Sequence, residues 1–89
     1  MPNEKDRGEI FEVHLRNKPL VSGIRTQELS AKSEGFSGAD IASVCYKAAL
    51  GAIRRAVEEE KETSGKPTRV LIQMEDIETA FNEVLQELK

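Results

Sequence analysis

Few side chains in this sequence could carry out chemistry, and their spacing forms no catalytic group. His14 is the single histidine and Cys45 the single cysteine. A Ser-His-Asp arrangement would need a serine on a strained turn beside His14, and no such motif occurs. The sequence also lacks a G-x-x-x-x-G-K-[ST] phosphate loop, a G-x-G-x-x-G motif and an H-E-x-x-H motif. We therefore expect no catalytic residue and no metal ligand in this chain.

Two places are candidates for contact with a ligand. His14 lies at the edge of an apolar stripe, where its ring could make a local hydrogen bond or stack on a planar ligand. Ser37 and Asp40 have the spacing of a helix capping box. Capping does not explain Gly38, because Gly in a first helical turn costs up to about 1 kcal/mol relative to Ala. The small pair Gly38 and Ala39 would let a ligand approach the backbone amides.

Four helices are expected to position these residues. Asn3 is a good N-cap for a first helix over 4–16, which Pro19 should stop. Thr26 can cap a short second helix that ends at Gly35, a residue suited to the left-handed position after a helix. The third helix begins after Ser37.

The fourth helix begins near residue 74, after a polar loop over 58–68 and an extended run over 69–73. This run could pair with residues 20–24 over two or three residues. The predicted fold is all-α, with four helices, a long central helix and at most a very short strand pairing.

The third helix shows the clearest periodicity. Its apolar residues are spaced alternately three and one apart, so the stripe winds around the helix and predicts neighbours on more than one side. Cys45 lies on this stripe and is expected in the core, whereas Arg54 and Arg55 are expected at its solvated rim. The stripe comprises Ile41, Val44, Cys45, Ala48, Ala49, Ala52, Ile53, Ala56 and Val57. The buried face predicted for the last helix comprises Ile77, Ala80, Phe81, Val84, Leu85 and Leu88.

Composition narrows the classes of function. Eighty-nine residues allow one small domain. Thirteen Lys and Arg against sixteen Asp and Glu give a net charge of −3, which argues against a nucleic-acid partner. No apolar run approaches the roughly 20 residues that cross a bilayer, so we expect no membrane partner. A single cysteine is typical of a reducing compartment and favours a cytoplasmic location.

Three segments in order resemble the C-terminal small helical lid domain of AAA ATPases. They are RGEIFEVHLRNKPL, LSAKSEGFSGADIASVCYKAALGAIRRAV and VLIQMEDIETAFNEVL, and the G-F-S-G-A-D core is the most specific part. The likeness runs from Pro2 to about Leu88. Within the family, the long insertion before Val70 is most like the valosin-containing-protein (CDC48-type) group.

The resemblance implies a role for each candidate position. His14 matches the helix histidine that lies against the adenine and ribose of bound ATP or ADP. Gly38 and Ala39 match the pair whose backbone approaches the same nucleotide. The Walker motifs and the Mg²⁺ ligands would belong to a large AAA domain of the same chain, so residues 1–89 would be a fragment without catalysis of its own. The parent would be a homo-hexamer that unfolds or remodels protein substrates, with the lid passing motion to neighbouring subunits.

Two other interpretations stay open from the sequence. The chain could be a free-standing helical interaction module that presents a groove to a partner peptide. It could also be a helix-turn-helix DNA binder using residues 26–57, although its acidity disfavours this.

Overall fold

Four helices form the structure, a computed structural model that describes residues 2–16, 18–62 and 70–88. They are α1 (Glu4–Leu15), α2 (Thr26–Lys32), α3 (Gly38–Glu62) and α4 (Met74–Glu87). In the described part, the extended contact reduces to one isolated parallel bridge between Leu20 and Ile72. Two hydrogen bonds hold it, from Val21 N to Ile72 O (2.9 Å) and from Ile72 N to Pro19 O (2.8 Å). The predicted all-α class and the short pairing are confirmed.

Local capping chemistry determines where α1 and α3 begin. The Asn3 side chain accepts a hydrogen bond from the Asp6 amide at 2.8 Å. At the start of α3, the Asp40 amide donates to Ser37 Oγ (3.1 Å) and the Ser37 amide donates to Asp40 Oδ2 (2.9 Å). This reciprocal pair satisfies two donors that a helix start leaves free, and it confirms the predicted capping box.

The start of α2 differs from the prediction. Thr26 is already helical, and Arg25 is the N-cap without a side-chain cap. The Thr26 hydroxyl is turned toward α1, where it lies 3.4 Å from Glu12 Oε1. Thr26 is therefore wrong as a cap, because its hydroxyl finds a tertiary partner instead of the helix's own amides. The turn after α2 does pass through Gly35, whose φ of +85° suits a residue without a Cβ.

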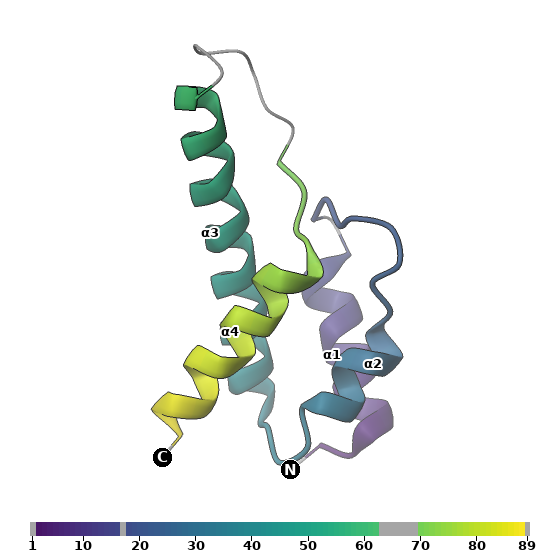
Figure 1. The fold of residues 1–89 in the computed structure, drawn as a ribbon. Coiled ribbons are helices and arrows are strands. Elements are labelled where there is room, and N and C mark those ends of the chain that lie inside the picture. Colours follow the sequence, from purple (N-terminus) through teal and green to yellow (C-terminus); the bar gives the residue numbers. More distant parts are fainter. Residues whose placement is uncertain (1, 17, 63–69, 89) are drawn as a thin grey trace.

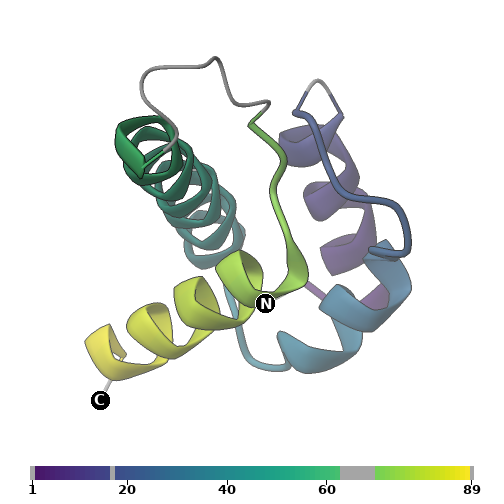
Figure 2. The same ribbon diagram turned by 45° about the horizontal axis from the view of Figure 1, so that its top comes forward.

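Phe81 of α4 joins the core of the domain. Its ring lies 6.0 Å from that of Phe11 in α1 and 5.6 Å from that of Phe36, which precedes α3. α3 packs against α4 and α1, and α2 packs against α1. Figures 1 and 2 show α4 crossing α3 at a steep angle, with α1 and α2 on the other side of the chain entering α4. The remaining core residues include Leu15, Leu29, Ile41, Val44, Cys45, Ala48, Ala52, Ile72, Ile77, Ala80 and Val84.

Four residues that we predicted to be buried are exposed. Ile53 and Val57 on α3 are 48% and 46% exposed, and Leu85 and Leu88 at the end of α4 are 43% and 53% exposed. Ile53 and Val57 lie on the side of α3 away from the buried Ala48 and Ala52. Leu85 and Leu88 lie near the end of α4, which leads away from the core in Figure 1. α1 and α4 both contact α3, but they leave the part of the stripe that carries Ile53 and Val57 uncovered.

The polar segment after the α3 stripe is partly helical. α3 continues to Glu62, so the first five residues of the predicted loop over 58–68 belong to the helix. The rest of that loop, and the start of the extended run over 69–73, lie outside the described residues. Glu and Lys propagate a helix well, which explains why the end of the apolar pattern did not end the helix.

Candidate functional site

His14 and Gly38 both lie near one apolar side chain, that of Ile10. His14 is one turn after Ile10 on α1, and both residues line a shallow hollow of about 390 Å³ together with Asp6, Glu9 and Val13. A Cβ added at Gly38 would lie 3.8 Å from Ile10 Cδ1, so the start of α3 packs against the same side chain. We call this region the Ile10 edge. All the residues that line the hollow belong to α1. Gly38, at the start of α3, is linked to the hollow by its closeness to the Ile10 side chain.

The start of α3 presents free backbone donors beside this edge. The Ile41 amide donates to Ser37 O, and the Asp40 amide is used by the capping box. Within the residues that the structure describes, no hydrogen bond involves the amides of Gly38 and Ala39, which belong to the first turn. Ala39 is exposed. The free amides and the helix dipole favour an electron-rich group at this point.

The first turn of α1 is held by a buried arginine that the sequence analysis missed. Arg7 is 7% exposed. Its Nε donates to Ser30 O (3.1 Å) and lies 3.2 Å from Ser33 Oγ, and its Nη1 donates to Pro2 O (3.1 Å). The guanidinium thus ties the Ser30 carbonyl of α2 to the segment that enters α1. The sequence does indicate this position, because Phe11 and Leu15 follow Arg7 by four and eight residues and share its face of the helix.

A lysine holds the other end of α1, next to His14. Lys18 Nζ donates to the main-chain oxygen of His14. A cation at a helix C-terminus satisfies a carbonyl without an intrahelical partner and interacts favourably with the helix dipole. In the sequence, this role is indicated by a lysine four residues after His14 and directly before Pro19. We assigned no role to Lys18 from the sequence.

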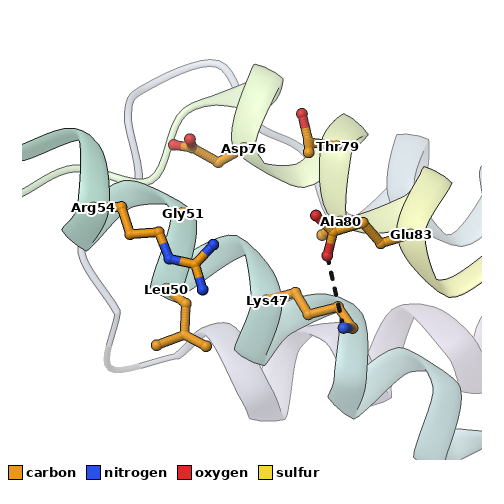
Figure 3. A pocket seen from close by; sticks show the side chains of 8 residues that line it. All are labelled: Lys47, Leu50, Gly51, Arg54, Asp76, Thr79, Ala80 and Glu83. Atoms are coloured by element: carbon orange, nitrogen blue, oxygen red, sulfur yellow. Dashed lines mark ion pairs between the residues drawn. The ribbon is translucent and has the colours of Figure 1, made fainter.

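A second hollow of about 300 Å³ lies between α3 and α4, and we call it the α3–α4 hollow (Figure 3). Lys47 on its α3 side pairs with Glu83 (3.6 Å) and Glu87 (3.1 Å) of α4. The hydrogen bond to Glu87 raises the pKa of Lys47. The lining residues are Lys47, Leu50, Gly51, Arg54, Asp76, Thr79, Ala80 and Glu83.

Arg55 joins α3 to the start of α4. Its Nη1 donates to both carboxylate oxygens of Asp76, at 2.6 and 2.8 Å, and its Nη2 donates to Leu71 O at 2.8 Å. The hydrogen bond to Asp76 raises the pKa of Arg55 above its usual value. We predicted a solvated or rim position for Arg55. Its side chain is 25% exposed and pairs with α4, so Arg55 lies at the rim of the stripe and not in free solvent.

Cys45 is a core residue, as predicted. Its side chain is 2% exposed, and burial raises the pKa of its thiol to about 11. Among residues 2–16, 18–62 and 70–88, no group of three or more His, Cys, Asp or Glu side chains could hold a metal ion. None of the helices in this described part has both the length and the apolar character that crossing a bilayer requires.

The fold defines the class of protein, a small all-helical domain with a long third helix. A family model described as the AAA+ lid domain matches residues 23–65. The chain belongs to the AAA+ lid domain family, and the family resemblance inferred from its sequence is confirmed.

Three curated proteins illustrate what the chain is similar to. Cell division cycle protein 48 homolog of Archaeoglobus fulgidus is 46% identical over 71 residues, covering 73% of this chain and 10% of that protein. Protein SAV of Sulfolobus acidocaldarius is 33% identical over 88 residues, covering 99% of this chain and 11% of that protein. ATP-dependent zinc metalloprotease FtsH 2 of Thermoanaerobacter is 39% identical over 88 residues, covering 99% of this chain and 15% of that protein. The chain therefore spans less than a fifth of the length of each of these relatives.

Proposed function

We propose that this domain is the lid of an AAA ATPase and completes that enzyme's adenine-nucleotide site. The observation that carries the proposal is the Ile10 edge, where His14 and Gly38 approach one apolar side chain from two helices. Ile10 and Val13 offer an apolar wall for a flat base, and the His14 ring adds a polar group at its rim. The free amides of Gly38 and Ala39 would add donors to the same ligand.

The phosphates and Mg²⁺ of the nucleotide would be held by the large AAA domain of the parent chain. The 89-residue sequence has no phosphate loop, and the described residues offer no metal-binding group. Bound nucleotide supplies the reactive phosphate chain, whereas this domain's residues would bind and orient the base. Ala39 contributes no charge, so the lid would not sense the γ-phosphate through a side chain at this position.

We propose further that the lid acts as a lever in a homo-hexameric machine that unfolds or remodels proteins in the cytoplasm. Arg7 supports this role, since its hydrogen bonds fix the entering segment at Pro2 to α2 and so to the body of the domain. A change of angle at that segment would then turn the whole lid. Such a change can follow from different contacts to nucleotide in two states.

Substitutions at the Ile10 edge test the nucleotide role in the parent ATPase. We expect His14→Ala and Ala39→Arg each to change ATP affinity or turnover by about fivefold or more, the effect of one lost or blocked polar contact. Fluorescent-nucleotide titration and steady-state ATP hydrolysis would measure this.

Two controls accompany this experiment. Glu12→Ala lies on the same helix but faces α2, so it should leave affinity and turnover unchanged. The isolated 89-residue chain should bind ATP more weakly than micromolar, because most of the site lies elsewhere. Equal effects of Glu12→Ala and His14→Ala, or micromolar affinity of the isolated chain, would contradict the shared site.

A further inference from the structure

α3 carries a second apolar stripe on the side away from the core. Tyr46, Leu50, Ile53 and Val57 follow one another at intervals of four, three and four residues, so they form one line along the helix. Tyr46 is 64% exposed, Ile53 48% and Val57 46%, and Leu50 is half-buried. At about 100° per residue, this line lies opposite the buried Ala48 and Ala52. We call these four residues the outer stripe.

The outer stripe is more than scattered surface hydrophobicity. Single exposed apolar residues are normal, but a contiguous line of large ones marks an interaction site. A helix that is apolar on two opposite sides is normally covered on both. In this structure α4 and α1 contact α3, and Leu50 also lines the α3–α4 hollow, whereas Tyr46, Ile53 and Val57 are exposed. The stripe starts eight residues after Gly38, about 12 Å along the helix axis, so it is separate from the Ile10 edge.

The two flanks of the stripe differ in chemistry. On one flank lie the half-buried Ala42 and Ala49, which let another helix approach closely. On the other lie Lys47 and Arg54, both of which line the α3–α4 hollow. In Figure 3, the Arg54 side chain lies along the α3 side of that hollow, whereas Asp76 and Thr79 lie on the α4 side. A partner would therefore meet small residues on one side and cations on the other.

α4 is an example of the kind of helix that packs against α3. α4 is acidic and amphipathic, and its carboxylates pair with α3 cations: Glu83 and Glu87 with Lys47, and Asp76 with Arg55. Arg54, by contrast, is exposed and forms no ion pair within the part of the chain that the structure describes. Charge complementarity therefore calls for an acidic partner on the outer side as well.

A second copy of this chain is a poorer occupant. The outer stripe spans twelve residues, about 17 Å of helix, whereas a stable dimer needs about 800 Å² from each partner. Antiparallel pairing of two outer stripes would set Lys47 beside Arg54, which is repulsive. Parallel pairing would set Arg54 beside Ala49 or Ala56. Neither arrangement gives Arg54 a carboxylate.

We propose that the outer stripe and Arg54 form a docking surface for an acidic amphipathic helix of a partner protein. The apolar face of the partner would cover Tyr46, Leu50, Ile53 and Val57, and one of its carboxylates would pair with Arg54. This is recognition of a helix by a helical surface, with anchors at heptad spacing. It does not depend on nucleotide binding at the Ile10 edge.

Binding of a designed peptide to the 89-residue chain tests the proposal. The probe is a fluorescein-labelled peptide of three heptads, with Leu and Ala on one face and Glu on the other, measured by fluorescence anisotropy. We expect saturable binding that Ile53→Glu weakens about tenfold or more, since it puts a charge where an apolar side chain is covered. Arg54→Glu should weaken binding about fivefold, because an attractive pair becomes a repulsive one.

Matched controls distinguish binding at the outer stripe from non-specific hydrophobic binding. Leu85→Glu makes the same change at a similarly exposed leucine of α4 and should leave binding unchanged. Circular dichroism would check that every variant keeps its helix content. Binding that Ile53→Glu does not weaken would overturn the proposal, as would equal binding of a peptide with Lys in place of every Glu. Sedimentation that shows self-association, lost in Ile53→Glu, would replace the acidic helix by a second copy.

Discussion

Burial keeps the single cysteine, Cys45, protonated and unreactive in the core. Cys45 lies on the core side of α3, and desolvation is the main cause of the rise in its thiol pKa. The positive charge of Lys18 acts in the opposite direction but less strongly. The thiolate is the reactive form of cysteine, so a thiol held protonated inside the core is inert at neutral pH.

The raised pKa predicts a loss of stability in alkali. The thiol pKa rises from 9.0 to about 11 on folding, so the unfolded chain loses its proton first as the pH increases. The contribution of Cys45 to the free energy of unfolding should be complete below pH 9.0 and should fall between pH 9.0 and about 11.

Urea unfolding across this pH range would measure the effect, with Cys45→Ala as the control. The variant keeps a small apolar side chain but has no proton to lose. Its stability should fall less steeply in the same window, whereas parallel curves for the two proteins would refute the assignment. The raised pKa of Lys47 affects both proteins alike.

At the scale of the element, Asp76 links the start of α4 to α3. It accepts a hydrogen bond from the Gln73 amide at 2.8 Å, which caps α4, and both of its carboxylate oxygens accept from Arg55 Nη1. Its side chain is 8% exposed. One carboxylate therefore begins a helix and also fixes that helix on its neighbour.

We expect Asp76→Ala to lower the free energy of unfolding by about 1–3 kcal/mol, since it removes a cap and takes from the half-buried Arg55 its main acceptor. Urea denaturation monitored by circular dichroism would measure the loss. Glu75→Ala is a matched control on the adjacent residue. The side chain of Glu75 is 68% exposed and lies 3.5 Å from Arg55, so its loss should cost about 0.5 kcal/mol or less. Equal losses would show that Asp76 acts only as a surface charge.

At the scale of the whole molecule, one ring joins three parts of the chain. Phe81 contacts Phe11 and Phe36, so α4, α1 and the segment before α3 depend on the same side chain. Phe81→Ala should cost about 3–5 kcal/mol, which is a large share of the roughly 5–15 kcal/mol that stabilises a small domain.

Thermal unfolding of the 89-residue chain would test this dependence. The wild-type chain should melt in one cooperative transition, and Phe81→Ala should melt far lower or be unfolded at 25 °C. Leu88→Ala removes an exposed leucine just beyond the same helix and should change the melting temperature little. A small shift for Phe81→Ala, or two separate transitions in the wild-type chain, would contradict a single core.

Local signals in the sequence determined much of this structure. Asn3, Ser37 with Asp40, and Gly35 marked helix boundaries correctly, because capping bonds and a positive φ depend on residues three or four positions apart. Ordered blocks of motif residues were sufficient to identify the AAA+ lid family. The site residues His14, Gly38 and Ala39 came from that likeness, and their role in nucleotide binding stays a prediction.

Tertiary structure alone decided which sides of the helices are covered. Ile53 and Val57 belong to the same apolar periodicity as Ala48 and Ala52, yet they are exposed because they lie on the side of α3 that its described neighbours do not cover. Arg7 is charged but buried, because carbonyls from α2 and from Pro2 surround its guanidinium. Periodicity along one helix shows where its apolar faces are. The length and crossing of the neighbouring helices determine which of those faces they reach.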